Sequence, residues 1–264
     1  MAKGKAKTTH LGIQGLVGHT SAPDWSFIYE TSLTKHPKWN IGDRVVLPDG
    51  REFRYGKSAG ECVSGLGCRF MAAGFSNYTA ADVAQAIDDR QITVPDAATH
   101  DAVDKDELRG GYVVLYGASE NIQFRGIIGN DAADADAQCV VYLDGPLVAA
   151  VVVGTTGIEV FQNPYASLLT AGTVNKAVAG CPATQVSAAD TYFWVQVKGP
   201  CWVSPRGGVN DRDQGCYWTH EGQIKDTEAS LGAITLPDTN TSQYAGHTIL
   251  GNEDTIGPLF MLQG

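Results

Sequence analysis

An acidic cluster is the feature of this sequence most suited to metal chemistry. Asp131, Asp134 and Asp136 lie close together in the run NDAADADAQ. Three carboxylates can ligate Ca²⁺, but their spacing differs from that of an EF-hand loop, and the loop's glycine and closing glutamate are missing. The cluster therefore predicts a polar loop between strands.

Other motifs also fail the spacing that their chemistry requires. His220 and Glu221 begin a zincin-like motif, but Ile224 stands where the second histidine ligand is needed. Neighbouring carboxylates such as Asp88 and Asp89 point apart on a helix, and the run NDRDQG is typical of a turn. We therefore expect no enzyme activity, no catalytic residue, no cofactor and no metal.

The charge of the chain is unevenly distributed. Residues 1–57 carry nine Lys or Arg and five Asp or Glu, whereas the rest carries ten against 24, and the net charge is −10. An acidic body argues against nucleic acid as a direct partner. A basic arm on an acidic body favours docking on an acidic surface, including that of a neighbouring copy, although a solvated, frayed tail is the alternative.

The cysteines give no metal-binding or secretory signature. Cys62 and Cys68 are near enough in sequence to be bridged, but the six cysteines form no C-x-x-C pair. The segment after Met1 is polar, which indicates synthesis in a reducing cytoplasm with free thiols. No apolar run approaches about 18 residues, so we expect no membrane helix.

The elements that would position any site are mainly strands. Residues 39–57 predict a hairpin closed by Pro48 and Gly50, with alternating apolar and charged residues on either side. Strand-length runs follow, among them GYVVLYG, IQFRGIIG, AQCVVYLDGPL and GIEVFQNPY. The run TYFWVQVKGPCWVSPRGG predicts a second hairpin that bends at Gly199. Helical spacing after Thr79 predicts one short helix over residues 80–89.

The predicted fold is mainly β, an antiparallel sandwich or barrel-like structure with three regions. Residues 1–38 form an extended arm, 39–108 a hairpin region with the short helix and an acidic linker at 95–110, and 109–264 an antiparallel β domain. Alternating aromatic residues in the arm predict a short strand with its rings on one side. The expected partner-binding residues are those rings and the arm's three lysines: Lys3, Lys5, Lys7, Trp25, Phe27 and Tyr29.

Three segments resemble recurring segments of the virion structural proteins of tailed bacteriophages. They are WNIGDRVVLPDGREFRYGKSAG, LDGPLVAAVVVGTTGIEVFQNPY and TYFWVQVKGPCWV, in the same order and covering about a quarter of the chain. The resemblance is greatest to capsid decoration, or cement, proteins, which bind the outside of the head and hold its subunits together. The cysteines and the aromatic residues at 25–29 are not part of this resemblance.

The resemblance implies a structural protein of the capsid exterior, made in the host bacterial cytoplasm. Its partners would be the major capsid protein and neighbouring copies of itself, with a trimer favoured by analogy. Two alternatives stay open. One is a head-fibre or tail component, and the other is a glycan-binding protein that uses some of the five Trp and ten Tyr as a platform.

Overall fold

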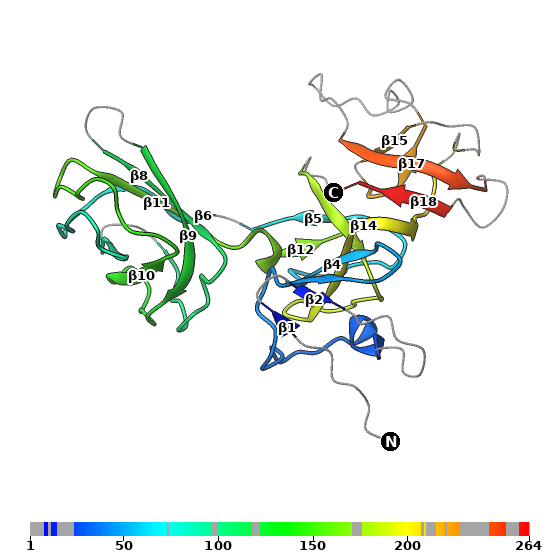
Figure 1. Ribbon diagram of the computed structural model, residues 1–264, viewed down its shortest axis with the longest axis horizontal. Helices are drawn as coiled ribbons and strands as arrows, with labels where there is room; N and C mark the ends of the chain where they lie inside the picture. Colours follow the sequence, from blue (N-terminus) through cyan, green and yellow to red (C-terminus); the bar gives the residue numbers. More distant parts are fainter. Residues whose placement is uncertain are drawn as a thin grey trace. The chain divides into compact units, whose positions relative to one another are not determined.

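The chain divides into two compact units, each built mainly from curled antiparallel sheets. The computed structural model describes residues 8–9, 12–14, 24–72, 74–96, 100–117, 122–170, 176–206, 209, 215–219, 221–226, 243–251 and 259–263. Met1–Met71 and Ser167–Gly264 form what we call the discontinuous unit, and Ala72–Ala166 form the inserted unit (Figure 1). The predicted class, mainly β with antiparallel, barrel-like sheets, is confirmed.

The discontinuous unit contains a twelve-stranded sheet among its described residues. The main path runs β1-β2-β3-β4-β14-β18-β17-β15-β16, and β13, β5 and β12 branch from β14. The strands are β1 Thr8–Thr9, β2 Gly12–Gln14, β3 Arg44–Val46, β4 Glu52–Lys57, β5 Cys68–Phe70, β12 Leu168–Leu169, β13 Val178–Pro182, β14 Tyr192–Trp202, β15 Cys216–Trp218, β16 Ile224–Lys225, β17 Tyr244–Leu250 and β18 Leu259–Leu262.

The first predicted hairpin is present as β3 and β4. The two strands pair antiparallel, with Val45 opposite Phe53, and both of these side chains are buried. The amide of Gly50 donates to the carbonyl of Leu47 at 3.0 Å, and Gly50 has a φ of +86°, which glycine adopts without steric cost. The turn residues therefore fix the register that buries one face of the hairpin.

The second predicted hairpin is wrong, because β14 is one strand of 11 residues. Residues up to Lys198 pair with β4, and Gly199 onward pairs with β18. Gly199 has a φ of +92°. The Gly-Pro pair therefore moves the strand from one neighbour to another and does not reverse the chain.

An aromatic core forms where residues 24–39 pack against β4 and β14. Its buried members are Ile28, Trp39, Val45, Leu47, Phe53, Tyr55 and Trp194. A second core in the same unit gathers around β15, β17 and β18 and includes Trp218, Phe260 and Leu262. All six cysteines of the chain are free thiols and buried.

The two ends of the inserted unit join the discontinuous unit at residues that pair with each other. The amide of Met71 donates to the carbonyl of Ser167 at 2.8 Å. Next to it, Phe70 of β5 pairs with Leu168 of β12. The chain thus leaves and re-enters the discontinuous unit at neighbouring positions.

The inserted unit is a six-stranded sheet with the order β6-β11-β8-β9-β10-β7 among its described strands. Its elements are β6 Gly74–Ala80, β7 Gln91–Val94, β8 Tyr112–Tyr116, β9 Ile122–Asn130, β10 Cys139–Leu143, β11 Gly157–Phe161 and the 3₁₀ helix η3 Pro164–Ala166. Every pairing in this sheet is antiparallel.

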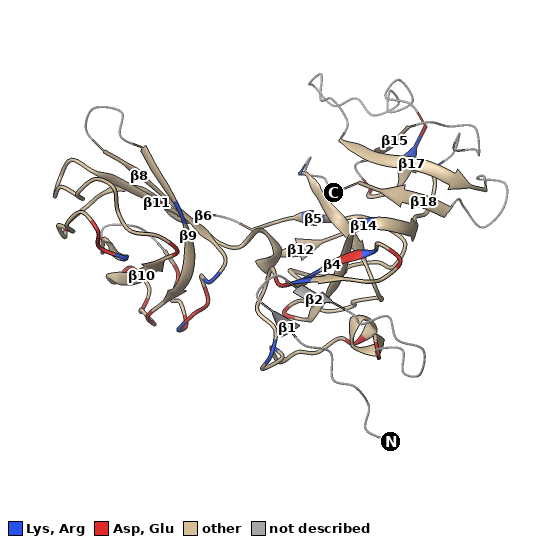
Figure 2. Cartoon of the chain, viewed as in Figure 1, with Lys and Arg blue, Asp and Glu red and all other residues tan. Residues whose placement is uncertain are grey.

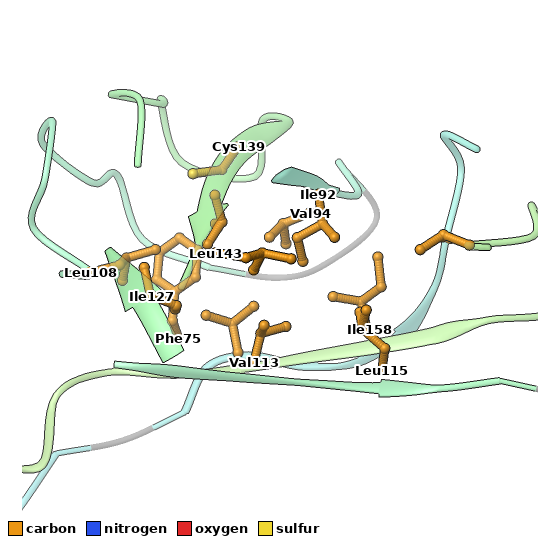
Figure 3. Packing of buried hydrophobic residues seen from close by; sticks show 14 of the residues in the cluster. Phe75, Ile92, Val94, Leu108, Val113, Leu115, Ile127, Cys139, Leu143 and Ile158 are labelled. Atoms are coloured by element: carbon orange, nitrogen blue, oxygen red, sulfur yellow. The ribbon is translucent and has the colours of Figure 1, made fainter. Parts of the chain in front are cut away.

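One face of this curled sheet encloses the core of the inserted unit. Val113, Leu115 and Ile158 point from one layer toward Ile92 and Leu143 of the other (Figure 3). These five side chains are fully buried. Because side chains alternate along a strand, the neighbours of Val113, Leu115 and Ile158 in sequence lie on the opposite face.

Two sequence expectations about this unit are wrong. The predicted helix at 80–89 is absent: Gln85 forms an antiparallel bridge with Val151, and Asp88 has a φ of +74°. Residues 95–110 form an irregular loop among their described residues, but the segment is not a linker, because Val103 and Leu108 are buried in the core of the inserted unit. Residues 97–99 lie outside the description.

The compact units also differ from the three expected regions. Neither position 38 nor position 108 is a boundary, and the actual boundaries follow Met71 and Ala166. The described helices are two short 3₁₀ turns, η1 at Ser26–Tyr29 and η3. Among the described residues, no helix has the length and apolar character needed to cross a membrane.

Candidate binding surface on the inserted unit

The outer face of the inserted sheet is rich in exposed aromatic and aliphatic side chains. They come from β6, β11, β8 and β9, on the side opposite the core. We call this surface the aromatic face; its residues are Tyr78, Tyr112, Val114, Tyr116, Ile122, Phe124, Ile128, Glu159 and Phe161. Phe124 is 58% exposed and Ile122 is 63% exposed.

Strand register places these residues side by side. Phe161 of β11 lies opposite Tyr112 of β8, and Val114 of β8 lies opposite Phe124 of β9. The rings of Tyr112 and Phe124 stack with their centroids 5.1 Å apart and their planes 14° from parallel. Ring stacking of this kind holds exposed aromatic side chains in one arrangement before a partner arrives.

A second pair of rings covers the β6 side of the face. Tyr78 and Tyr116 lie 5.5 Å apart between ring centroids. The ring of Tyr78 occupies the space that a Cβ on Gly157 would need. Glycine at 157 therefore lets the tyrosine lie against the strand backbone.

One carboxylate lies within the strands of this apolar surface, and a second, that of Asp144 after β10, lies against Gly126 beside Phe124. The four strands contain a single Asp or Glu, Glu159, and a single Lys or Arg, Arg125. The hydroxyl of Tyr116 donates to Oε2 of Glu159 at 2.9 Å. This hydrogen bond, followed by partial burial, raises the pKa of Tyr116, because an ionised tyrosine would lose the bond and face a carboxylate.

The size of the face makes it a candidate binding surface. Six of its apolar side chains are between about a third and two thirds exposed. With roughly 200 Å² for each large side chain, they present about 600 Å² of accessible apolar surface. The largest patch on a typical monomer is about 300–600 Å², and patches of this size are often functional.

The loops of the inserted unit are acidic, and they also expose four aliphatic side chains, Ile87, Val148, Val152 and Val153. The unit has 14 Asp or Glu and four Lys or Arg, a net charge of −10, so the discontinuous unit is neutral overall. Of the 13 acidic residues of this unit that the structure describes, 12 lie in segments between strands, and Figure 2 shows red loops on this unit. The unit thus combines acidic loops, in which some aliphatic side chains are exposed, with one aromatic sheet face.

In the predicted acidic loop, Asp131 and Asp136 accept hydrogen bonds from within the inserted unit. Both carboxylate oxygens of Asp131 accept from the hydroxyl of Tyr142, at 3.1 and 3.0 Å, and Oδ1 of Asp136 accepts from the amide of His100 at 3.0 Å. Asp134, with Asp104 and others, lines a cavity of about 460 Å³. Among the described residues, no group of His, Cys, Asp and Glu is arranged to hold a metal ion.

His100 contacts both of the loops that line this cavity. Its Nδ1 lies 2.7 Å from the carbonyl oxygen of Asp101, and its Nε2 lies 2.8 Å from that of Ala137. The ring also packs against Phe75, with centroids 4.5 Å apart. His100 is buried, so these contacts join two acidic loops to the core of the inserted unit.

Only three of the six expected partner-binding residues, Trp25, Phe27 and Tyr29, lie among the described residues. Lys3, Lys5 and Lys7 lie outside the described residues, as do His220, Asp211 and Asp213. The predicted strand at 25–29 is wrong: residues Ser26–Tyr29 form the 3₁₀ helix η1.

The aromatic residues of that segment pack mainly on their own unit. Phe27 stacks on Trp39 with centroids 5.4 Å apart and meets Trp194 edge-on at 5.7 Å. Trp25 and Phe27 are partly buried against this core, whereas Tyr29 is exposed and accepts a hydrogen bond from Arg51 at 3.3 Å. The three rings therefore do not share one side of an extended strand.

Sequence reasoning missed the aromatic face, although a signal was present. In YVVLY, apolar or aromatic residues occupy both alternating positions, which is typical of a strand covered on both faces, and in GIEVF Phe161 adds an aromatic residue on the side that carries Glu159. In the structure one of those faces is exposed. This mismatch between strand composition and exposure is the reason to treat the face as a candidate site.

Comparison of the chain with protein-family models, with curated proteins and with solved structures gives no match.

Proposed function

We propose that this chain is a structural binding protein that decorates the exterior of a tailed-bacteriophage head and stabilises it. The observation that carries the proposal is the aromatic face, a preformed apolar surface on a unit whose loops carry most of its acidic residues. Apolar surface drives association when it is removed from water, and acidic loops keep the free protein soluble. The aromatic face would lie against the major capsid protein, with the acidic loops in solvent.

The positions of the three phage-like segments support this proposal. The first and third contain β4 and β14, which are adjacent strands in one sheet although about 140 residues separate them in sequence. The second contains β11, the strand that carries Glu159 and Phe161. The resemblance thus falls on the framework strands of both units and includes part of the aromatic face.

Many copies acting on a symmetric shell would supply the stabilising effect. Each copy would bury a surface of roughly standard size for one side of an interface. Contacts between neighbouring copies, most simply in a trimer, would add avidity through high effective concentration. In this proposal Lys3, Lys5 and Lys7 contribute attraction to an acidic neighbour, and the chain has no catalytic role.

Copy number provides the direct test. Quantitative gel analysis of purified particles should give hundreds of copies of this chain per head. A few copies per particle would instead indicate a head-fibre or tail component. Absence from particles, together with retention on a glycan array, would indicate a glycan-binding protein and overturn the proposal.

A further inference from the structure

Glu159 lies in the middle of the aromatic face. It is opposite Val114, and Val114 is in turn opposite Phe124 on the next strand. Phe161 follows two residues later on the same side of β11, and Tyr116 donates its hydroxyl proton to Oε2. Any partner that covers the rings therefore also covers this carboxylate.

Covering a carboxylate is costly unless the partner supplies a positive charge. Removing an unpaired ionised group from water costs several kcal/mol, and one hydroxyl donor offsets part of that cost. Among the described residues, Glu159 forms no ion pair with a Lys or Arg. Arg125, the one cation on these strands, donates to the carbonyl oxygens of Pro146 and Phe124.

We propose that the aromatic face binds a site on the head shell where one arginine projects from an apolar surface and pairs with Glu159. This inference rests on the proposed function and names the chemistry of its partner. A planar guanidinium can engage a carboxylate edge while its faces stack on aromatic rings, here those of Tyr112, Tyr116 and Phe161. The net charge of −10 on the inserted unit also favours a positively charged partner.

Charge also argues against a second copy of the same face as the occupant. Two aromatic faces packed on each other would bring two Glu159 carboxylates into one apolar interface. Like charges in such a site repel, and one of them would have to take up a proton. A basic, apolar shell surface avoids this cost.

The test compares four full-length proteins in binding to heads assembled from the same phage's major capsid protein without this chain. Wild type is compared with Glu159→Gln, Phe124→Ser and the control Asp134→Asn. Asp134 lies on an exposed loop away from the face, and its substitution removes the same single charge. Because Glu159, Phe124 and Asp134 lie outside the core, all variants should keep the wild-type circular dichroism spectrum and melting temperature.

We expect Glu159→Gln and Phe124→Ser each to raise the Kd for heads by about thirtyfold or more, and Asp134→Asn by less than about threefold. The effect of Glu159→Gln should persist at high salt, because a desolvated pair is screened weakly. If wild type binds and Glu159→Gln binds equally well, the arginine pairing is wrong while the decoration function stands. If wild type does not bind heads, the proposed function itself fails. If sedimentation velocity shows that wild type forms a dimer and Phe124→Ser does not, the aromatic face binds a second copy of this chain, and the proposed shell contact is wrong.

Discussion

Replacing Ile28 by alanine tests whether residues 24–39 belong to the discontinuous unit or extend away from it. Ile28 lies in η1 and is fully buried beneath the aromatic core that includes Trp39 and Trp194. Truncating a buried isoleucine to alanine costs about 2–5 kcal/mol, depending on how far the site collapses. Since η1 is a short surface element that can relax inward, we expect about 2–3 kcal/mol.

Urea unfolding followed by tryptophan fluorescence measures the loss of stability of the discontinuous unit. All five tryptophans lie in the discontinuous unit, so the signal is not mixed with unfolding of the inserted unit. With a urea dependence of about 2–3 kcal/mol per M, the midpoint should fall by about 1 M.

Tyr29→Ala is the matched control for this experiment. Tyr29 is the next residue in η1 but is exposed, and its hydroxyl accepts from Arg51 at 3.3 Å. We expect its midpoint to stay within about 0.2 M of wild type, because exposed contacts contribute little. Equal midpoints for Ile28→Ala, Tyr29→Ala and wild type would refute the placement of η1 in the core.

Three further predictions concern single buried or paired groups. His100→Ala should destabilise the inserted unit by about 2–4 kcal/mol, because it removes the ring's polar contacts with the loop carbonyls of Asp101 and Ala137 and its packing against Phe75. Hydrogen exchange should then rise in residues 100–107 and 131–137 and not in β14. Burial raises the pKa of the Cys139 thiol to about 11, so native protein at pH 8 should resist iodoacetamide at this residue, and rapid native labelling would contradict its buried position. The hydrogen bond from Lys57 lowers the pKa of Asp190, so this pair stabilises the fold above the unfolded-state pKa of an aspartate, and the effect is lost as pH falls through the lower folded-state value. Because Asp190 is exposed, Asp190→Asn should make only a small part of the acid-induced loss of stability disappear, and a larger loss of stability in acid for the variant would argue against the pair.

The hairpin could be predicted because its signals are local. Pro48, Asp49 and Gly50 specify the turn, and the alternation of Val45 and Phe53 with charged neighbours specifies the buried face. The strands β8 to β11 were predictable for the same reason, since each is a short apolar run between turn residues.

The errors arise where long-range contacts override local spacing. Residues 80–89 have apolar side chains at helical intervals, but Gln85 bridges to Val151 and residues 87–88 form a turn, so the segment is irregular. Gly199 and Pro200 resemble a turn, yet β4 and β18 pair with the two sides of the bend and keep it one strand. Neither contact has a signature within its own segment.

The inserted unit could not be predicted from composition along the chain. Its boundaries depend on the contact between Met71 and Ser167, which are about a hundred residues apart. The aromatic face depends on the same assembly, because Tyr112, Phe124 and Phe161 come from three strands that only the sheet register brings together. The sequence contains the rings, whereas the exposure of one sheet face is a property of the folded unit.

Oxidative footprinting tests the central claim most directly, by comparing the full chain free in solution with the same chain bound to heads. The account predicts that Tyr78, Tyr112 and Phe124 are labelled in the free protein and strongly protected on the head. Tyr29, exposed on the discontinuous unit, serves as the internal reference for labelling that does not depend on this face. Head-bound protein in which the three residues of the aromatic face are labelled as fast as in the free protein would contradict the account.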